Sequence, residues 1–346
     1  MASHRRPKQP SRARVTVLTA TAAAAVALSS QAAQAAEPKP SKEDVKEKVD
    51  KLYEDAEKAT EKYNGAKETQ GKLEKQVEAL QDKVARGQDE LNDLRDGLGS
   101  MASAQYRTGG IDPAVQLFLS SDPDSYLEKA STLDQVSAKQ ADTLQQIQSK
   151  QRNLAQQRQE AQTKVKDLAD TRKQLGEKKD EVRAKLAEAQ KLLNTLTAQE
   201  RAALAKEEES RASRDGGTSS RADLGNSVPS SQVAAAAFAA AQSKIGTPYV
   251  YGASGPSSFD CSGLTSWAYA QAGAAIPRTS QAQASAGTRI GMSQLKQGDL
   301  VIFYGDLHHV GFYAGNGQVL HAPKPGANVR YESINNMPFQ FGVRMV

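Results

Sequence analysis

The chain has 346 residues, of which 25% are charged and 5% are aromatic. So few aromatic residues argue against one large hydrophobic core that spans the whole chain. Five of the 45 basic residues lie in the first 14 positions and no acidic residue precedes Glu37, so the remaining Lys and Arg equal the 40 Asp and Glu in number. The net charge of +5 therefore comes from the N-terminal segment, and the composition gives no indication of nucleic-acid binding.

The first 35 residues follow the order of a secretory signal peptide. Residues 1–14 are basic, an apolar run extends from Val15 to Ser30, and the small residues Ala33 and Ala35 fit a signal-peptidase site. The apolar run is shorter than the roughly 20 residues that a membrane span requires. We therefore expect residues 1–35 to be removed and the protein to be secreted and extracytoplasmic; the alternative is a retained N-terminal anchor.

Two long tracts within residues 41–207 repeat apolar side chains every three and four positions. The first extends from Val45 to Leu98 and the second from Leu144 to Leu196, with mostly charged and polar residues between the repeats. This heptad pattern predicts a long α-helical coiled coil. Glycines and prolines interrupt the pattern near 99–125. The two tracts can therefore form an antiparallel hairpin within one chain or a dimeric coiled coil.

The interruption contains a short apolar cluster at 115–119. An exposed apolar patch between two polar helices favours a docking site for a partner, whereas the alternative is a coiled coil that serves only as a spacer. Residues 208–230 are rich in Ser, Gly, Arg and Asp and predict a flexible linker. The remaining residues, 231–346, hold most of the aromatic side chains and are predicted to form a compact domain.

The chain has a single cysteine, Cys261. It cannot form an intramolecular disulfide, which leaves a buried inert thiol, an intermolecular link or a nucleophile. Residues rich in Gly, Pro and Ser precede it and a helical apolar pattern follows it. This position predicts a cysteine in the first turn of a helix, where the backbone amides lower the pKa of a thiol.

A thiol nucleophile needs a base, and the histidines beyond the leader are His308, His309 and His321. A Gly-Asn-Gly turn at 315–317 predicts a hairpin whose strands carry His309 and His321. Pairing across this turn would bring the two side chains together as base and orienting group. No CxxC or HExxH motif accompanies Cys261, so we expect no metal and no cofactor.

Several motifs of this region resemble those of the NlpC/p60 cell-wall peptidases, over about 233–346. The matching segments are Gly246-Thr247-Pro248-Tyr249, Tyr251-Gly252, Asp260-Cys261-Ser262-Gly263, Ile276-Pro277-Arg278-Thr279-Ser280, Gly298-Asp299-Leu300-Val301, His309-Val310-Gly311-Phe312-Tyr313 and His321-Ala322. Gln297 departs from the pattern, since a proline often precedes this Gly-Asp pair. The resemblance implies a papain-like α+β NlpC-type domain with an antiparallel sheet. It also implies hydrolysis of peptidoglycan stem peptides, typically between γ-D-glutamate and the diamino acid.

The resemblance further implies the residues of the site. These are the catalytic residues Cys261, His309 and His321, with Tyr251, Asp260, Ser262 and Arg278 at the oxyanion and substrate positions. The same residue types have structural explanations: a core tyrosine for Tyr251, a helix N-cap for Asp260 and a surface charge for Arg278.

A signal peptide, coiled coil, linker and peptidase domain in this order resemble the secreted PcsB and Rip hydrolases associated with cell division. This resemblance implies a cell-wall-associated protein whose helical arm regulates or docks the enzyme, commonly through FtsX-type membrane partners. If the arm blocks the groove, the full chain should be less active than residues 230–346 alone. Two other functions remain open: a catalytically silent cell-wall scaffold, and an acyltransferase or amidase on the same fold.

Overall fold

The computed structural model describes residues 41–107, 115, 119, 123–213 and 229–345. Within them, the segment from Ser41 to the C-terminal end forms one compact unit. The predicted signal peptide, the centre of the 115–119 cluster and most of the predicted linker lie outside the described residues. None of the helices in the described part combines the length and the hydropathy that a membrane span requires.

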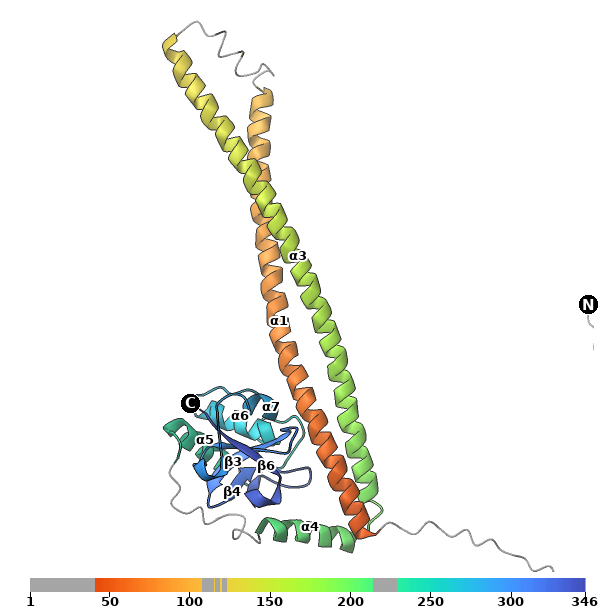
Figure 1. Cartoon of the computed structure of the whole chain (residues 1–346). Coiled ribbons are helices and arrows are strands. Elements are labelled where there is room, and N and C mark those ends of the chain that lie inside the picture. Colours follow the sequence, from red (N-terminus) through yellow and green to blue (C-terminus); the bar gives the residue numbers. More distant parts are fainter. Residues whose placement is uncertain (1–40, 108–114, 116–118, 120–122, 214–228, 346) are drawn as a thin grey trace, which may run out of the picture. The chain divides into compact units, whose positions relative to one another are not determined.

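Two long helices, α1 (Lys42–Arg107) and α3 (Pro123–Leu193), lie side by side (Figure 1). Val45 near the start of α1 packs in one cluster with Ala189 near the end of α3. Leu91 near the end of α1 packs against Leu154, in the first half of α3. The helices are therefore antiparallel, and the pairing predicted from the two heptad tracts forms within one chain.

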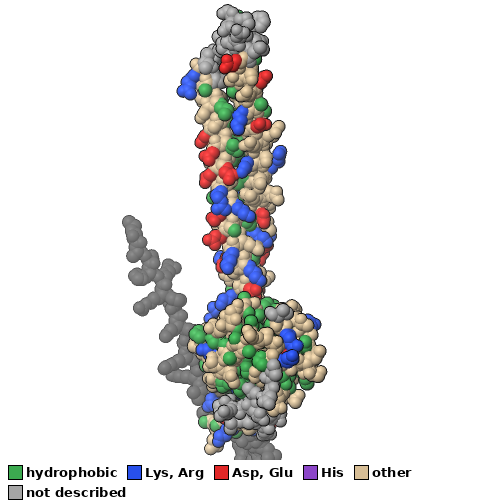
Figure 2. Space-filling view, turned by 90° about the vertical axis from the view of Figure 1, so that its left-hand side faces the viewer, with side chains coloured by type: hydrophobic (Ala, Val, Ile, Leu, Met, Phe, Trp, Pro, Cys, Tyr) green, Lys and Arg blue, Asp and Glu red, His purple; other side chains and the backbone are tan. Residues whose placement is uncertain are grey.

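Between these apolar contacts the hairpin surface carries charged side chains of both signs (Figure 2). Arg172 lies 2.9 Å from Glu74, and Lys185 lies 3.4 Å from Asp55, so cross-helix ion pairs accompany the apolar seam. These pairs are partly exposed and each contributes at most about 1 kcal/mol. The free energy that holds the hairpin together therefore comes mainly from the buried apolar positions of the two heptad tracts.

The helical region ends later than the composition suggests. Helix α4 (Ala198–Ser213) follows α3 and extends six residues into the predicted linker, 208–230. Its Leu204 packs with Val45 and Val49 of α1, and Glu208, the first residue of the predicted linker, forms a 3.2 Å ion pair with Lys46 of α1. The next described helix, α5 (Gln232–Gln242), begins after Ser231, whose hydroxyl caps the helix by accepting a hydrogen bond from the amide of Ala234.

The C-terminal region contains a six-stranded antiparallel sheet in the order β1-β6-β2-β3-β4-β5. The strands are β1 (Thr288–Ile290), β2 (Leu300–Phe303), β3 (His309–Gly315), β4 (Gln318–His321), β5 (Arg330–Ser333) and β6 (Phe339–Arg344). Strands β3 and β4 form the predicted hairpin, with Phe312 opposite Leu320. This sheet, together with α5 and α6 (Cys261–Gln271), confirms the predicted α+β fold beside a long helical region.

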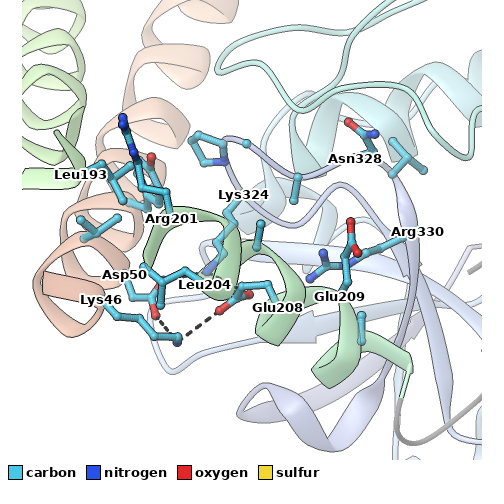
Figure 3. Close-up of a pocket in the computed structure, with 18 of the residues that line it drawn as sticks. Lys46, Asp50, Leu193, Arg201, Leu204, Glu208, Glu209, Lys324, Asn328 and Arg330 are labelled. Carbon is cyan, nitrogen blue, oxygen red and sulfur yellow. Dashed lines mark hydrogen bonds and ion pairs between the residues drawn. The ribbon is translucent and has the colours of Figure 1, made fainter. Parts of the chain in front are cut away.

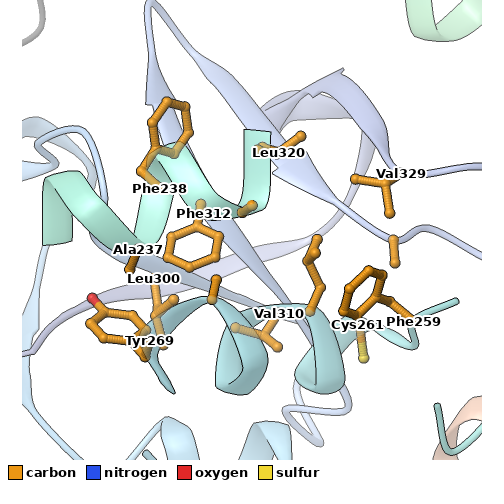
Figure 4. Close-up of a cluster of buried hydrophobic side chains, with 14 of the residues drawn as sticks. Ala237, Phe238, Phe259, Cys261, Tyr269, Leu300, Val310, Phe312, Leu320 and Val329 are labelled. Atoms are coloured by element: carbon orange, nitrogen blue, oxygen red, sulfur yellow. The ribbon is translucent and has the colours of Figure 1, made fainter. Parts of the chain in front are cut away.

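The main core lies between the sheet and helices α5 and α6. Phe238 of α5 and Tyr269 of α6 both contact the ring of Phe312 on β3, at centroid distances of 6.2 and 5.7 Å. Cys261 lies at one end of this core beside Phe259 (Figure 4). The nucleophile candidate is thus placed by a helix that is packed firmly on the sheet.

Two glycines permit the close approaches that shape this region. A Cβ atom on Gly263 would lie 2.1 Å from the carbonyl oxygen of Ala253, so only glycine lets the preceding loop pack on the first turn of α6. A Cβ atom on Gly311 would lie 2.6 Å from Val319 and 2.9 Å from His321. A glycine at this point of β3 therefore lets β4, which carries His321, lie close against it.

Candidate active site

Cys261, His309 and His321 meet although they lie up to 60 positions apart in the sequence. Cys261 is the first residue of α6, and the carboxylate of Asp260 caps this helix by accepting a 2.6 Å hydrogen bond from the amide of Gly263. A ring nitrogen of His309 and the sulfur of Cys261 lie within 4.8 Å of each other. Both side chains are buried. The structure therefore brings the predicted nucleophile and base together.

The two histidines form a chain of hydrogen bonds that leads away from the thiol. Nε2 of His309 lies 2.8 Å from Nδ1 of His321, and Nε2 of His321 lies 3.3 Å from the carboxylate of Glu332. Burial lowers the pKa of His321 to about 4, although Glu332 opposes the shift. His321 is thus neutral at physiological pH and can hold the imidazole of His309 in one orientation.

The neighbouring His308 points elsewhere. Its Nδ1 is hydrogen-bonded to Asp306, and its ring stacks on Tyr304 with centroids 4.3 Å apart. The sequence places two histidines side by side. The side chain of His309 lies at the thiol, whereas His308 approaches the sulfur with its backbone carbonyl, at 3.7 Å.

Asp260, which is buried, and Arg278, which is partly buried, form an ion pair next to the thiol. The guanidinium of Arg278 donates to both carboxylate oxygens of Asp260, at 2.7 and 3.0 Å, and to the hydroxyl of Ser262 at 2.8 Å. Of the two alternatives for Arg278, a substrate position or a surface charge, the ion pair with Asp260 argues against a free surface charge. The pair holds the loop after α6 against the start of that helix, where Asp260 is also the N-cap.

The phenol of Tyr251 points toward α1, where it donates a 3.1 Å hydrogen bond to the backbone carbonyl of Tyr53. Burial raises the pKa of Tyr251, so its hydroxyl is a neutral donor at any physiological pH. A donor at this position is what an oxyanion would require. In this structure the carbonyl of α1 takes that hydrogen bond.

Helix α1 places acidic side chains directly in this site. Oε1 of Glu57 lies 2.5 Å from Nδ1 of His309, the ring nitrogen on the side away from His321. Glu61, one turn further along, lies 3.9 Å from the sulfur of Cys261. Both carboxylates are buried. Nothing in the sequence pattern predicts this contact, because Glu is common on every polar face of α1.

These carboxylates shift the pKa values of the predicted nucleophile and base. Burial raises the pKa of the Cys261 thiol well above its usual range, and the charges of Glu57 and Glu61 add to the shift. Burial alone would lower the pKa of His309, but Glu57 outweighs it and the net shift is upward. The expected lowering of the thiol pKa by the start of α6 is therefore wrong for this arrangement. The two nearby negative charges and the exclusion of water outweigh the helix amides.

Glu61 lies in a small pocket of hydrogen-bond donors. One carboxylate oxygen accepts from the hydroxyl of Ser262 at 2.6 Å. The other accepts from the backbone amide and the hydroxyl of Ser280, at 2.7 and 3.2 Å. Ser280 begins the short helix α7 (Ser280–Gln283). Burial, followed by the charge of Asp260, raises the pKa of Glu61 to about 7.

Further contacts hold α1 to the C-terminal domain. Asn64 donates a 3.1 Å hydrogen bond to Asp260. Outside the site, Lys324 lies 2.7 Å from Asp50 of α1 and 3.2 Å from Glu208 of α4. These charges line a pocket of about 660 Å³ where α1, α4 and residues 324–331 meet (Figure 3). The arm formed by α1, α3 and α4 is thus attached both at the candidate active site and at a separate network of ion pairs.

Comparison with known proteins identifies the domain that carries this site. The sequence profile described as the NlpC/P60 family matches residues 246–344. Residues 246–344 belong to the NlpC/P60 family. This confirms the resemblance drawn from the motifs around Cys261 and His309.

Individual relatives match part of this chain at high identity. A probable endopeptidase of Corynebacterium glutamicum is 49% identical over 123 residues, which are 36% of this chain and 59% of that protein. The probable endopeptidase p60 of Listeria monocytogenes is 49% identical over 100 residues, 28% of this chain and 20% of that protein. The solved NlpC/p60 domain of the peptidoglycan hydrolase SagA is 45% identical, with a TM-score of 0.31, over 32% of this chain and 98% of that one. The chain spans no more than about three fifths of these curated relatives.

Removal of His321 should reduce turnover by the NlpC/P60 domain without abolishing it. In His321→Ala the imidazole of His309 loses its 2.8 Å partner, and we expect kcat to fall about 10-fold to 100-fold with KM little changed. His321→Asn retains a polar partner and should recover part of the rate. Steady-state kinetics of both variants would check this. An unchanged kcat, or a change confined to KM, would contradict a role in orienting His309.

Proposed function

We propose that this chain is a secreted peptidoglycan hydrolase that cleaves stem peptides with Cys261 as nucleophile and His309 as base. The family assignment and the relatives named as endopeptidases support the reaction class. The approach of Cys261 and His309 within 4.8 Å supports the roles of these residues. The predicted leader, residues 1–35, supports export to the cell wall, where the substrate is located.

The reaction begins when Nδ1 of His309 takes the thiol proton of Cys261. The thiolate attacks the amide carbon, and the resulting oxyanion is stabilised by the backbone amide of Cys261 and the phenol of Tyr251. His309 then gives its proton to the leaving amine, which leaves a thioester on Cys261. Water, deprotonated by His309, attacks the thioester and releases the carboxylic acid and the free thiol. His321 accepts the Nε2 proton of His309 in a hydrogen bond throughout.

The bond between γ-D-glutamate and the diamino acid is the proposed site of cleavage. The pocket filled by Glu61 supports this choice, since it presents a backbone amide and two hydroxyls to a carboxylate next to Cys261. A γ-linked glutamate keeps its α-carboxylate free, and this group can take the place of Glu61 when the γ-carbonyl lies at the thiol. Arg278, which donates to Ser262, adds positive charge to that pocket.

The structure with α1 in the site supports an inhibited form of the enzyme. Glu57 occupies the nitrogen of His309 that must receive the thiol proton, Glu61 fills the carboxylate pocket, and Tyr53 takes the phenol of Tyr251. A stem peptide cannot bind until these groups leave. The arm therefore regulates the enzyme by docking in the active site of the same chain.

Release of the arm is proposed to depend on an FtsX-type membrane partner that contacts the far end of the helical hairpin. There Tyr106 of α1, and Val115 and Leu119 beyond it, expose 85%, 48% and 72% of their surface, so large apolar side chains are available to a partner. A pull on this end acts on α1 directly, because the same helix carries Glu57 and Glu61.

Digestion of purified muropeptides, with products read by mass spectrometry, tests the proposed bond. We expect fragments that end in D-glutamate and new peptides that begin with the diamino acid. The enzyme should be a chain in which the arm no longer blocks the site, such as Glu57→Ala/Glu61→Ala/Asn64→Ala, alongside the unchanged chain. Cleavage at another bond would contradict the assignment. No cleavage by either protein, with both folded, would favour a cell-wall scaffold.

A further inference from the structure

Helix α1 completes a set of metal-ligating atoms that the NlpC/P60 domain does not hold by itself. A carboxylate oxygen of Glu57, the sulfur of Cys261 and a ring nitrogen of His309 all lie within 4.8 Å of one another. They come from α1, the first residue of α6 and the first residue of β3. All three side chains are buried, with exposed fractions of 7%, 0% and 1%. Among the described residues, these three bring metal-ligating atoms of Glu, Cys and His together at one point.

The chemistry of these three ligands is that of a zinc site. Thiolate, imidazole and carboxylate are the protein ligands that Zn²⁺ takes, in a tetrahedral arrangement. From Zn–ligand bonds of about 2.0–2.3 Å, neighbouring ligand atoms should be about 3.5 Å apart. Oε1 of Glu57 and Nδ1 of His309 are closer than this, at 2.5 Å. A rotation of the carboxylate that moves this oxygen by about 1 Å would make room for the ion.

The surroundings of His309 are also those of a metal ligand. Its Nε2 lies 2.8 Å from His321, whose own Nε2 lies 3.3 Å from Glu332. These hydrogen bonds hold the ring so that Nδ1 points to Glu57. Ligating histidines almost always have their second nitrogen fixed in this way, because the outer hydrogen bond sets the tautomer and the ring orientation.

We propose that the closed form of the chain, in which α1 lies in the active site, binds one zinc ion through Glu57, Cys261 and His309, with water as the fourth ligand. On binding, the thiol proton and the proton between His309 and Glu57 leave to solvent. The thiolate and the carboxylate then balance the charge of the ion in a buried site. One ligand comes from the arm and two from the catalytic pair, so the ion ties the arm to the groups that it covers.

The consequence for regulation is that zinc stabilises the closed form. Zinc bound only to this form shifts the equilibrium between closed and open arm toward the closed one. This consequence depends on the proposed hydrolase function, whereas the metal site itself does not. A binding measurement therefore tests the site independently of catalysis.

Competition with a chromophoric zinc chelator would measure the affinity of the unchanged chain for Zn²⁺. We expect one equivalent, loss of binding in Cys261→Ala and at least about a tenfold weaker affinity in Glu57→Gln. The matched control is Glu68→Gln, which removes a partly exposed ion pair with Lys72 on the same helix and should leave the affinity unchanged. Anomalous diffraction at the zinc edge should place the ion between the three ligands.

Three results would overturn the site: no zinc binding by the unchanged chain, equal affinity in Glu57→Gln, or anomalous density elsewhere. Circular dichroism would establish that Glu57→Gln is folded, and Glu57→Asp, which keeps the carboxylate, should bind more tightly than Glu57→Gln. If Glu57-dependent binding is found but muropeptides are not cleaved, the metal site is supported and the hydrolase proposal fails. If muropeptides are cleaved but zinc does not bind, the hydrolase proposal is supported and the metal site fails.

Discussion

Replacement of the three α1 side chains that enter the site should raise the rate of muropeptide cleavage about tenfold to a hundredfold. In Glu57→Ala/Glu61→Ala/Asn64→Ala, His309, Ser262, Ser280 and Asp260 lose their partners on the arm. A hydrogen bond to a charged group contributes about 1.5–3 kcal/mol, so three such losses outweigh the remaining surface ion pairs. The free energy that closes the arm falls, and the open fraction increases.

The same experiment has a readout that is independent of the substrate. Cys261 is fully buried in the closed form, so iodoacetamide should alkylate it slowly in the unchanged chain and faster in the triple variant. Glu68→Ala, a change at a partly exposed position of the same helix, is the matched control and should alter neither rate. Equal cleavage and equal alkylation rates in the triple variant and the unchanged chain would remove the inhibitory role of α1.

The rate advantage of the triple variant over the unchanged chain should become smaller as the pH rises. Docking raises the pKa of Glu61 to about 7, and Glu57 raises the pKa of His309. Groups with a raised pKa stabilise the closed form fully below their unperturbed pKa, and this stabilisation is lost as the pH rises through the raised value. The lowered pKa of Glu57 matters only under acidic conditions. With EDTA present, the ratio of variant to unchanged rates should therefore fall from pH 4.5 to about 7 through Glu61, and from pH 6.5 upward through His309.

Cys261→Ala should abolish cleavage, lowering the rate by about 10⁴-fold or more when introduced into the opened triple variant. The chain has no second thiol, and the nearby hydroxyls of Ser262 and Ser280 donate to the carboxylate of Glu61 rather than to His309. The fold should persist, since the change removes one sulfur atom at the end of the core. Cleavage rates and thermal unfolding of the same preparations would check both statements.

The control for this variant lies on the same helix. Ser266 donates its hydroxyl to the carbonyl of Gly263 within α6, so Ser266→Ala should keep the cleavage rate while making a change of similar size. Appreciable cleavage in the Cys261→Ala background would show that another group is the nucleophile. The assignment of His309 as base would then fall with it.

The local features of this protein could be predicted from the sequence. The heptad tracts predict the long helices because buried apolar positions repeat at the helical period, and the two clusters at Leu91 and Val45 lie on the predicted stripe. The Gly-Asn-Gly turn predicts the hairpin that brings His309 to His321, because such a turn admits positive φ angles. The Asp-Cys-Ser-Gly motif predicts both the helix start at Cys261 and the family.

Other features could not be predicted from the sequence. The heptads did not distinguish a hairpin from a dimer, because the same apolar stripe serves either pairing. Asn64, Glu57 and Glu61 were missed as site residues, as were Ser280 and Glu332. On α1 these side chains are ordinary polar positions in a helix full of Glu and Lys, and no spacing sets them apart. Their burial depends on contacts between segments about 200 to 250 positions apart.

The sequence by itself determined which groups could do chemistry: one thiol, two histidines on a hairpin and the capped helix that presents the thiol. Only the tertiary structure decided the state of those groups. Sequence reasoning places Cys261 at helix amides that favour a thiolate, and the structure surrounds it with Glu57 and Glu61 and excludes water. Protonation depends on the distances to charges and on the local dielectric, and these are properties of the packed molecule rather than of any one motif.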